Sequence, residues 1–356
     1  MKKILVVDDS ALMRRVLCDI INSDDRFEVV DEANNGEAAL ALLLEKTYDA
    51  VVLDVNMPKM DGIELLRELK KRELRPHILM ASTVTTQGAQ ITMDALELGA
   101  LDFIHKPDWA YRCKDDLFIH NFLTLLDAVC NAKIVETSEK SKREAAKATH
   151  TIEKLVRKSS QKITGNRIIA LACSTGGPRA LQSVIPNLPQ DMNAPMVLVQ
   201  HMPVGFTESL AARLNHLSKI TVVEASEGEV IKNGCVYIAK SGMHMNLVKK
   251  GIDTVVHYSD EPSREGVKPC ANYMYESLVN SDYDEVVCVV LTGMGADGME
   301  GIAHLKEKKK TFVITQDEES CVVYGMPKSV VKAGLSDETV TLSMIAQEII
   351  LHVGVK

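Results

Sequence analysis

The sequence predicts two α/β domains: an N-terminal domain with a five-stranded parallel sheet, and a C-terminal doubly wound, mostly parallel domain with a β-hairpin insertion. Three observations support this prediction. The 356 residues exceed the usual length of a single hydrophobic core. Short apolar runs alternate with stretches of helical period up to about residue 130. A second set of apolar runs follows a long polar stretch.

Five short apolar runs predict the strands of the first sheet, at residues 4–7, 28–31, 50–53, 78–81 and 102–104. Amphipathic stretches between and after them predict helices near 11–22, 36–46, 62–71, 88–98 and 115–130. This regular alternation of strands and helices is typical of β-α units around a parallel sheet. We therefore place the first domain at residues 1–125.

Residues 126–165 are predicted to link the first domain to a second one at 166–354. From about residue 131 this stretch is rich in Lys, Glu, Ser, Ala and Thr and lacks β-branched apolar runs. Apolar runs then predict strands at 167–172, 196–200, 285–291 and 311–315. Residues 220–260 carry short β-branched runs among Gly and Asn turns, which favours a β-hairpin insertion into the second sheet.

Composition and charge narrow the class of protein. No apolar segment is long enough to span a membrane, and Asp8 and Asp9 end the first apolar run too early for a signal peptide. The eight cysteines contain no CxxC pair, which fits the reducing cytoplasm. The net charge of −8 disfavours nucleic-acid binding. We expect a cytoplasmic monomer that inserts into no membrane.

Polar residues follow the predicted strands of the first domain, at the edge where parallel sheets bind ligands. They are Asp8, Asp9, Asp54, Ser82 and Lys106. Three converging carboxylates repel one another unless a hard cation such as Mg²⁺ joins them. Asp54 is then a candidate nucleophile toward a phosphoryl group, with Lys106 holding its oxygens and Ser82 bonding one after transfer. The alternative is that each acidic residue merely caps the following helix.

Residues 1 to about 125 resemble a two-component response-regulator receiver domain. The motifs are Val-Asp-Asp-Ser at 7–10, Asp-Val-Asn-Met-Pro-Lys-Met-Asp-Gly at 54–62, Ser82 and His-Lys-Pro at 105–107. The resemblance implies a flavodoxin-like fold, Asp54 as phosphoacceptor and a histidine kinase as phosphodonor. It also implies that Asp9 and the backbone at Asn56 contact Mg²⁺ with Asp8 assisting.

In the second domain, Ser174 follows a predicted strand and begins a turn with Gly176, Gly177 and Pro178. Such a turn at a helix N-terminus can hold an anion or the oxyanion of acyl transfer, so a phosphate-binding turn is an equal alternative. His201 favours acyl transfer, because it also follows a predicted strand and can act as general base.

Asp297 follows a third predicted strand and completes the residue types of a Ser-His-Asp triad. The N–H groups near Thr175, Gly176 and Met294 are candidates to bind the oxyanion or position the substrate. The chain order differs from that of α/β-hydrolases, and Gly-x-Ser-x-Gly is absent, so another hydrolase family is required.

Residues 165–350 resemble the catalytic domain of chemotaxis protein-glutamate methylesterases, and the tandem of domains resembles that family over nearly the whole chain. The motifs are Ser-Thr-Gly-Gly-Pro at 174–178, Gln-His-Met-Pro at 200–203, Leu-Thr-Gly-Met-Gly-Ala-Asp-Gly at 291–298 and Cys-Val-Val-Tyr-Gly-Met-Pro at 321–327. The resemblance implies hydrolysis of glutamate γ-methyl esters on methyl-accepting chemotaxis receptors, with deamidation of glutamines, through an acyl-enzyme on Ser174. It implies no cofactor for the esterase chemistry. It also implies that the unphosphorylated receiver covers the active-site rim and that phosphorylation at Asp54 loosens this packing.

One segment departs from the family pattern. Lys-Pro-Cys-Ala-Asn at 268–272 stands where Arg-Pro-Ser-Val-Asp is usual. The departure leaves open a receptor-docking adaptor without turnover. A receiver-coupled transcription factor is a second alternative, although no helix-turn-helix pattern follows residue 166.

Overall fold

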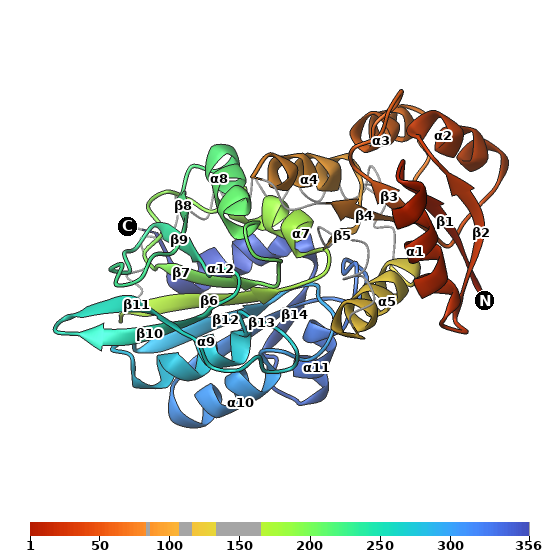
Figure 1. Cartoon of the computed structure of the whole chain (residues 1–356). Helices are drawn as coiled ribbons and strands as arrows, with labels where there is room; N and C mark the ends of the chain where they lie inside the picture. Colours follow the sequence, from red (N-terminus) through yellow and green to blue (C-terminus); the bar gives the residue numbers. More distant parts are fainter. Residues whose placement is uncertain (83–85, 107–115, 133–164, 356) are drawn as a thin grey trace. The chain divides into compact units, whose positions relative to one another are not determined.

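The computed structural model describes residues 1–82, 86–106, 116–132 and 165–355. Contacts within the chain divide it into two compact units, Met1–Ile134 and Val135–Lys356, called here the N-terminal and C-terminal units (Figure 1). Most of the stretch predicted as a linker, 126–165, lies outside the described residues, and its first part overlaps a helix that ends at Cys130. No helix in the described part of the chain has both the length and the apolar character needed to cross a membrane.

The sheet of the N-terminal unit has five parallel strands in the order β2-β1-β3-β4-β5. The strands are β1 (Lys2–Val7), β2 (Phe27–Ala33), β3 (Ala50–Asp54), β4 (Ile78–Ser82) and β5 (Asp102–His105). Each contains the residues predicted from an apolar run. Every residue of β3 and β4 is buried, which explains why these segments are almost continuously apolar.

Helices follow the strands of this unit as predicted: α1 (Ala11–Asn22), α2 (Gly36–Glu45), α3 (Gly62–Lys71), α4 (Thr86–Leu98) and α5 (Asp116–Cys130). A capping box starts α3: Asp61 Oδ1 accepts the N–H of Glu64 at 2.7 Å, and Glu64 Oε2 accepts the N–H of Asp61 at 3.0 Å. A Cβ on Gly62 would lie 2.3 Å from the carbonyl oxygen of Asp54, so only glycine allows α3 to start beside the end of β3.

Seven parallel strands form the main sheet of the C-terminal unit, in the order β14-β13-β12-β6-β7-β9-β8. They are β6 (Arg167–Cys173), β7 (Met196–Gln200), β8 (Thr221–Glu224), β9 (Cys235–Ile238), β12 (Glu285–Val290), β13 (Thr311–Gln316) and β14 (Glu338–Val340). The chain runs from β6 to β7 on one side and later returns to β12 on the other. The strand order therefore reverses at β6, the position where open α/β sheets bind ligands.

Helices cover both faces of this sheet (Figure 1). One face carries α7 (Gly177–Val184), α8 (Thr207–Leu217) and α12 (Ile345–Val353), and the other carries α9 (Ala271–Ser277), α10 (Met299–Lys308) and α11 (Met326–Lys332). Buried side chains of β6, β7, β12, α9 and α10 form a continuous core on the second face. This is the doubly wound arrangement predicted from the sequence.

The β-hairpin insertion is present but narrower than the predicted 220–260. It consists of β10 (His244–Lys250) and β11 (Asp253–Ser259), which pair antiparallel as a separate two-stranded sheet. The first part of the predicted region instead forms β8 and β9, which extend the main sheet in parallel. The expected insertion of the hairpin into the main sheet was therefore wrong. The short runs in β8 and β9 carry no signal that distinguishes parallel from antiparallel pairing.

Candidate active site and acidic pocket

Ser174, His201 and Asp297 lie beyond the carboxyl ends of three adjacent strands of the main sheet. Ser174 directly follows β6, His201 directly follows β7, and Asp297 lies on the loop that leaves β12. Because β6 is hydrogen-bonded to both β7 and β12, the three residues gather where the strand order reverses. Ser174 and His201 are partly exposed, whereas Asp297 is 2% exposed.

The side chains of His201 and Asp297 form a direct hydrogen bond. His201 Nε2 lies 2.8 Å from Asp297 Oδ2. An ionised carboxylate is an acceptor, so this contact assigns the ring proton to Nε2 and leaves Nδ1 as the basic nitrogen. Among the described residues, no hydrogen bond joins the hydroxyl of Ser174 to this ring. Catalytic hydrogen bonds are often long in the absence of substrate.

A single amide keeps the nucleophile turn next to the histidine. Gln200 Nε2 donates to the carbonyl oxygens of Ser174, at 3.0 Å, and His201, at 2.9 Å. The backbone N–H of His201 donates to the carbonyl of Cys173 at 3.1 Å. The ends of β6 and β7 are thus fixed side by side, which keeps the backbone of Ser174 close to that of His201.

The carboxylate of Asp297 accepts hydrogen bonds from the start of α9 as well as from His201. The backbone N–H of Ala271 donates to Oδ2 at 2.6 Å, and the N–H of Asn272 donates to Oδ1 at 3.0 Å. The thiol of Cys270 donates to Oδ1 at 2.9 Å. Burying a carboxylate costs several kcal/mol, while each hydrogen bond to a charge contributes about 1.5–3 kcal/mol, so these four donors can offset the cost.

The same hydrogen bonds determine the protonation state of Asp297. Burial alone would raise the pKa of this carboxyl, but the bonds from His201, Cys270 and Ala271 outweigh burial and hold the pKa below its ordinary value. The carboxylate is therefore ionised near neutral pH. An ionised carboxylate can orient the imidazole and stabilise its charged form.

Two glycines allow close packing around Ser174. Gly176 has a φ of 76° at the N-cap of α7, and a Cβ there would lie 2.7 Å from the Cβ of Val322. A Cβ on Gly293 would lie 2.8 Å from the Cβ of Ser174. The loop after β12 therefore packs directly on the serine, and the segment around Val322 supports the turn.

The loop after β12 is tied to its neighbours by Thr292. Its hydroxyl donates to the carbonyl of Thr175 at 3.0 Å and accepts the N–H of Val323 at 3.0 Å. In the described part of the chain, the backbone N–H groups of Thr175, Gly176 and Met294 donate to no acceptor. These donors are available to an oxygen that becomes negative during acyl transfer.

In the N-terminal unit, Lys106 joins two of the predicted carboxylates. Its Nζ lies 3.0 Å from Asp8 Oδ2 and 2.5 Å from Asp54 Oδ1, and all three side chains are buried. Carboxylate oxygens of Asp8, Asp9 and Asp54 lie within 4.8 Å of one another. Three carboxylates with all-oxygen donors in one pocket fit a hard divalent cation such as Mg²⁺. The structure thus brings Asp8, Asp9, Asp54 and Lys106 together, and the metal site itself stays a prediction.

Burial changes the titration of this pocket. Burial raises the pKa of Asp54, and the nearby Asp8 adds to this, although Lys106 opposes it. Burial disfavours the charged form of Lys106, but the attraction of Asp54 and Asp8 outweighs it and raises the pKa of this ammonium. A fixed positive charge thus lies beside the carboxylate that was predicted to accept phosphate.

The other predicted residues lie around this pocket. Ser82 is the last residue of β4, and its side chain is buried. Strand β4 pairs with β3 so that Asp54 lies opposite Ala81. Asn56 is exposed two residues after Asp54. The roles of Asp54 as phosphoacceptor and Ser82 as switch stay predictions.

Several residues that shape the site around Ser174 were not predicted from the sequence. Gln200 and Thr292 belong to recognised motifs, but nothing in their pattern indicated which carbonyls they bond. The donors at 270–272 had appeared only as a departure from the family pattern. Cys173, which directly precedes Ser174, is fully buried, and its thiol donates to Gln200 Oε1 at 3.0 Å.

Two family profiles match the chain. The CheB methylesterase profile matches residues 169–349, and the response regulator receiver domain profile matches residues 4–111. The crystal structure of the Thermotoga maritima CheB methylesterase catalytic domain is 39% identical in sequence, with a TM-score of 0.51, over 53% of this chain and 99% of that one.

Two curated proteins are similar over almost their whole length. The protein-glutamate methylesterase/protein-glutamine glutaminase of Bacillus subtilis (strain 168) is 41% identical over 359 residues, which cover 98% of each chain. A protein of the same name from Pyrococcus horikoshii is 39% identical over 99% of this chain and 94% of its own length.

Proposed function

This chain belongs to the CheB methylesterase family and carries a response-regulator receiver domain, as its motifs predicted, and from this we propose its function. The chain is a hydrolase, a protein-glutamate methylesterase and protein-glutamine glutaminase of chemotaxis whose activity is regulated by phosphorylation. Its substrates are methyl-accepting chemotaxis receptors. The observation that best supports the chemistry is the 2.8 Å bond between His201 and the buried Asp297, next to Ser174.

The reaction proceeds through an acyl-enzyme on Ser174. Its Oγ attacks the carbonyl carbon of the side-chain ester while His201 Nδ1 accepts the hydroxyl proton. The imidazole passes this proton to the departing methoxide, so methanol leaves. The same nitrogen then takes a proton from water, whose oxygen attacks the acyl group, and returns that proton to Ser174 as glutamate departs. Asp297 stabilises the imidazolium in both halves of the reaction. N–H groups of Thr175, Gly176 and Met294 stabilise the negative oxygen.

The test of this function is a two-product assay. The full-length chain is incubated with the signalling fragment of a receptor that carries methyl-labelled glutamates, and with the same fragment carrying glutamines. We expect labelled methanol from the first and ammonia from the second. Failure to release methanol would favour the adaptor that docks on receptors without turnover.

The acidic pocket accepts phosphate. Asp54 attacks the phosphorus of a phosphohistidine on the partner kinase, and the P–N bond breaks as the kinase imidazole leaves. Lys106 neutralises charge on the transferred phosphoryl group. Mg²⁺ held by Asp9, Asp54 and the backbone at Asn56, with Asp8 assisting, supplies further positive charge when bound. The hydroxyl of Ser82 then donates a hydrogen bond to an oxygen of the new phosphoryl group, and this contact switches the receiver to its phosphorylated state.

A phosphoryl mimic is expected to activate the esterase. Mg²⁺ with beryllofluoride should raise the rate of methanol release by about tenfold, inside the range of roughly 5- to 150-fold that is typical of coupled sites. The Asp54→Asn variant should show no acceleration, because it lacks the carboxylate that binds the mimic. Asp19→Asn is the matched control, since Asp19 is exposed on α1, and it should respond like wild type. An equal response in the Asp54→Asn variant would make the switch assignment wrong.

We place this activity in the cytoplasm and expect a monomer. The described cysteines are all free thiols, as a reducing compartment favours. The receptor signalling fragments and the kinase supply the only macromolecular partners that the proposed chemistry requires.

A further inference from the structure

The thiol of Cys270 touches the catalytic carboxylate that the proposed function assigns to Asp297. Its Sγ lies 2.9 Å from Asp297 Oδ1, and the Cys270 side chain is completely buried. We propose that Cys270 is a positioning residue of the esterase, whose S–H holds one oxygen of Asp297 and leaves the other aligned with His201. The proposal rests on the proposed function, and it concerns a residue that had raised doubt about activity.

The four donors to Asp297 divide evenly between its oxygens. Oδ2 accepts from His201 and from the N–H of Ala271, and Oδ1 accepts from Cys270 and from the N–H of Asn272. The two N–H donors belong to one rigid segment, and Cys270 is the only side chain among the described residues that bonds Oδ1. Without the thiol, rotation of the carboxylate out of its alignment with His201 is opposed by one donor fewer.

The thiol stays protonated and therefore remains a donor. Burial raises the pKa of Cys270 well above its ordinary value, and the negative charge of Asp297 raises it further. A thiol in this state is a poor nucleophile. These conditions exclude Cys270 as a rival to Ser174 and suit it to a hydrogen bond with a carboxylate.

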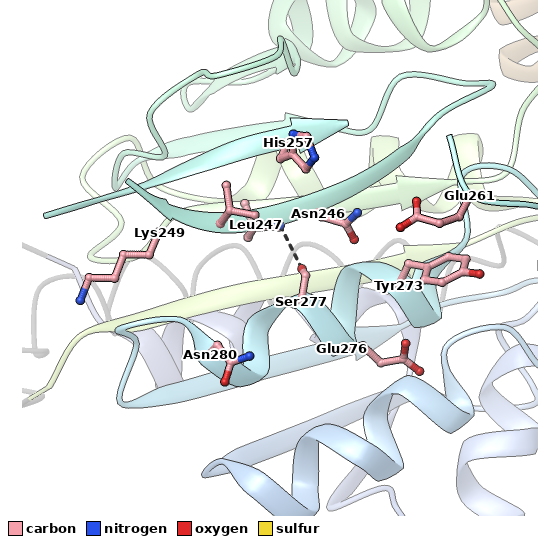
Figure 2. A pocket seen from close by; sticks show the side chains of 10 residues that line it. Asn246, Leu247, Lys249, His257, Glu261, Tyr273, Glu276, Ser277 and Asn280 are labelled. Atoms are coloured by element: carbon pink, nitrogen blue, oxygen red, sulfur yellow. Dashed lines mark hydrogen bonds between the residues drawn. The ribbon is translucent and has the colours of Figure 1, made fainter. Parts of the chain in front are cut away.

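The hairpin fixes the position of Cys270. The backbone N–H of Cys270 donates to His244 Nδ1 at 3.1 Å, and the other ring nitrogen of the fully buried His244 lies 3.1 Å from the carbonyl of Glu261. Further along the hairpin, the N–H of Leu247 donates to the Ser277 hydroxyl at 3.0 Å, which joins β10 to α9 (Figure 2). The start of α9 is therefore held from the hairpin side of the unit.

A pocket of about 480 Å³ lies on the same contact between β10, β11 and α9 (Figure 2). Tyr273 and Ser277 line it, whereas Cys270 does not. The ring of Tyr273 lies 4.6 Å from that of His244. The Cys270 contact is thus buried inside the protein, and Cys270 is not among the residues that line this pocket.

The contacts of Asn272 show why the change at this position of the segment is also compatible with activity. Its Oδ1 accepts the N–H groups of Gly298, at 3.0 Å, and Gly301, at 2.7 Å, at the start of α10. Its Nδ2 donates to Glu265 Oε1 at 2.8 Å. A carboxylate at this position would keep the first two bonds but repel Glu265. The neutral amide avoids a third negative charge beside Asp297.

The test compares Cys270→Ala, Cys270→Ser and wild type as full-length chains. We expect Cys270→Ala to lower kcat for methanol release about tenfold with KM unchanged, since a hydrogen bond to a charge is lost. The acid limb of its pH profile should move to lower pH, because a carboxylate that is no longer aligned with His201 stabilises the charged imidazole less. Cys270→Ser retains a donor and should restore both rate and profile. Cys288→Ala removes a buried thiol of β12 that makes no contact with Asp297, and its profile should match wild type.

A second readout does not require turnover. In protein labelled with ¹⁵N-histidine, the ring signals of His201 are assigned by their loss in His201→Gln, and their titration is followed in each variant. The titration midpoint should fall in Cys270→Ala and return to the wild-type value in Cys270→Ser. Glu265 and Tyr275 also interact electrostatically with Asp297, and neither residue is substituted in this series of variants.

The outcomes separate the two proposals. If the wild-type protein releases no methanol but the His201 titrations differ between variants as expected, the proposed function is wrong and the hydrogen-bond role of Cys270 stands. Normal methanol release with a Cys270→Ala variant whose kcat and titration match wild type would overturn the inference. So would a serine variant as impaired as the alanine variant, since that result indicates packing rather than donation.

Discussion

The Ser174→Ala variant is expected to lose methanol release by about 10⁶-fold, the size of loss seen when a serine hydrolase loses its nucleophile. The reason is that no acyl-enzyme can form, and the remaining N–H donors and binding contacts supply only residual catalysis over water. The measurement is labelled methanol released from the methylated receptor fragment at saturating substrate. Binding of the fragment should persist.

Ser183→Ala is the matched control for this variant. Ser183 lies exposed on α7, and the one acceptor of its hydroxyl within the described part of the chain is the Arg179 carbonyl, at 3.4 Å. Its removal should leave the rate unchanged. Undiminished release from Ser174→Ala would end the serine mechanism, whatever the rate of the control.

The His201→Gln variant is expected to lose at least about 10⁴-fold, because Ser174 then has no general base and the charge of Asp297 has no imidazolium to stabilise. The measurement is the same assay of methanol release. His216→Gln removes an exposed histidine of α8 and should behave like wild type.

The double variant provides the sharper test of the triad. Residues that act as one unit give losses that do not add, so Ser174→Ala with His201→Gln should be no slower than Ser174→Ala alone. A further large drop in the double variant would show that His201 works independently of Ser174. In that case its bond to Asp297 would have another purpose.

The strands were predictable because most are buried on both faces. A strand in the middle of a parallel sheet is an almost continuous apolar run, and β3, β6 and β12 are of this kind. The edge strand β8 and its neighbour β9 have only four residues each, so their pairing could not be predicted from their residues. Pairing depends on partners distant in the chain, which short runs do not identify.

The position of the site was predictable for a related reason. Parallel strands bring their carboxyl ends to one edge, so polar residues after apolar runs indicate a site without knowledge of the packing. This logic identified Ser174, His201 and Asp297. It could not identify the donors at 270–272, because their role depends on where α9 begins relative to a loop some 25 residues further along the chain. Short-range patterns contain no such information.

The amide of Gln200 has a consequence for how this sequence can change. It bonds two carbonyls through Nε2 and accepts the Cys173 thiol through Oε1, and a Cβ on Gly177 would lie 2.0 Å from Oε1. Substitution of any one of these three residues disturbs the other two. Active variants are therefore expected to change Cys173, Gly177 and Gln200 together. A library that varies one position at a time should find few tolerated substitutions at these three positions.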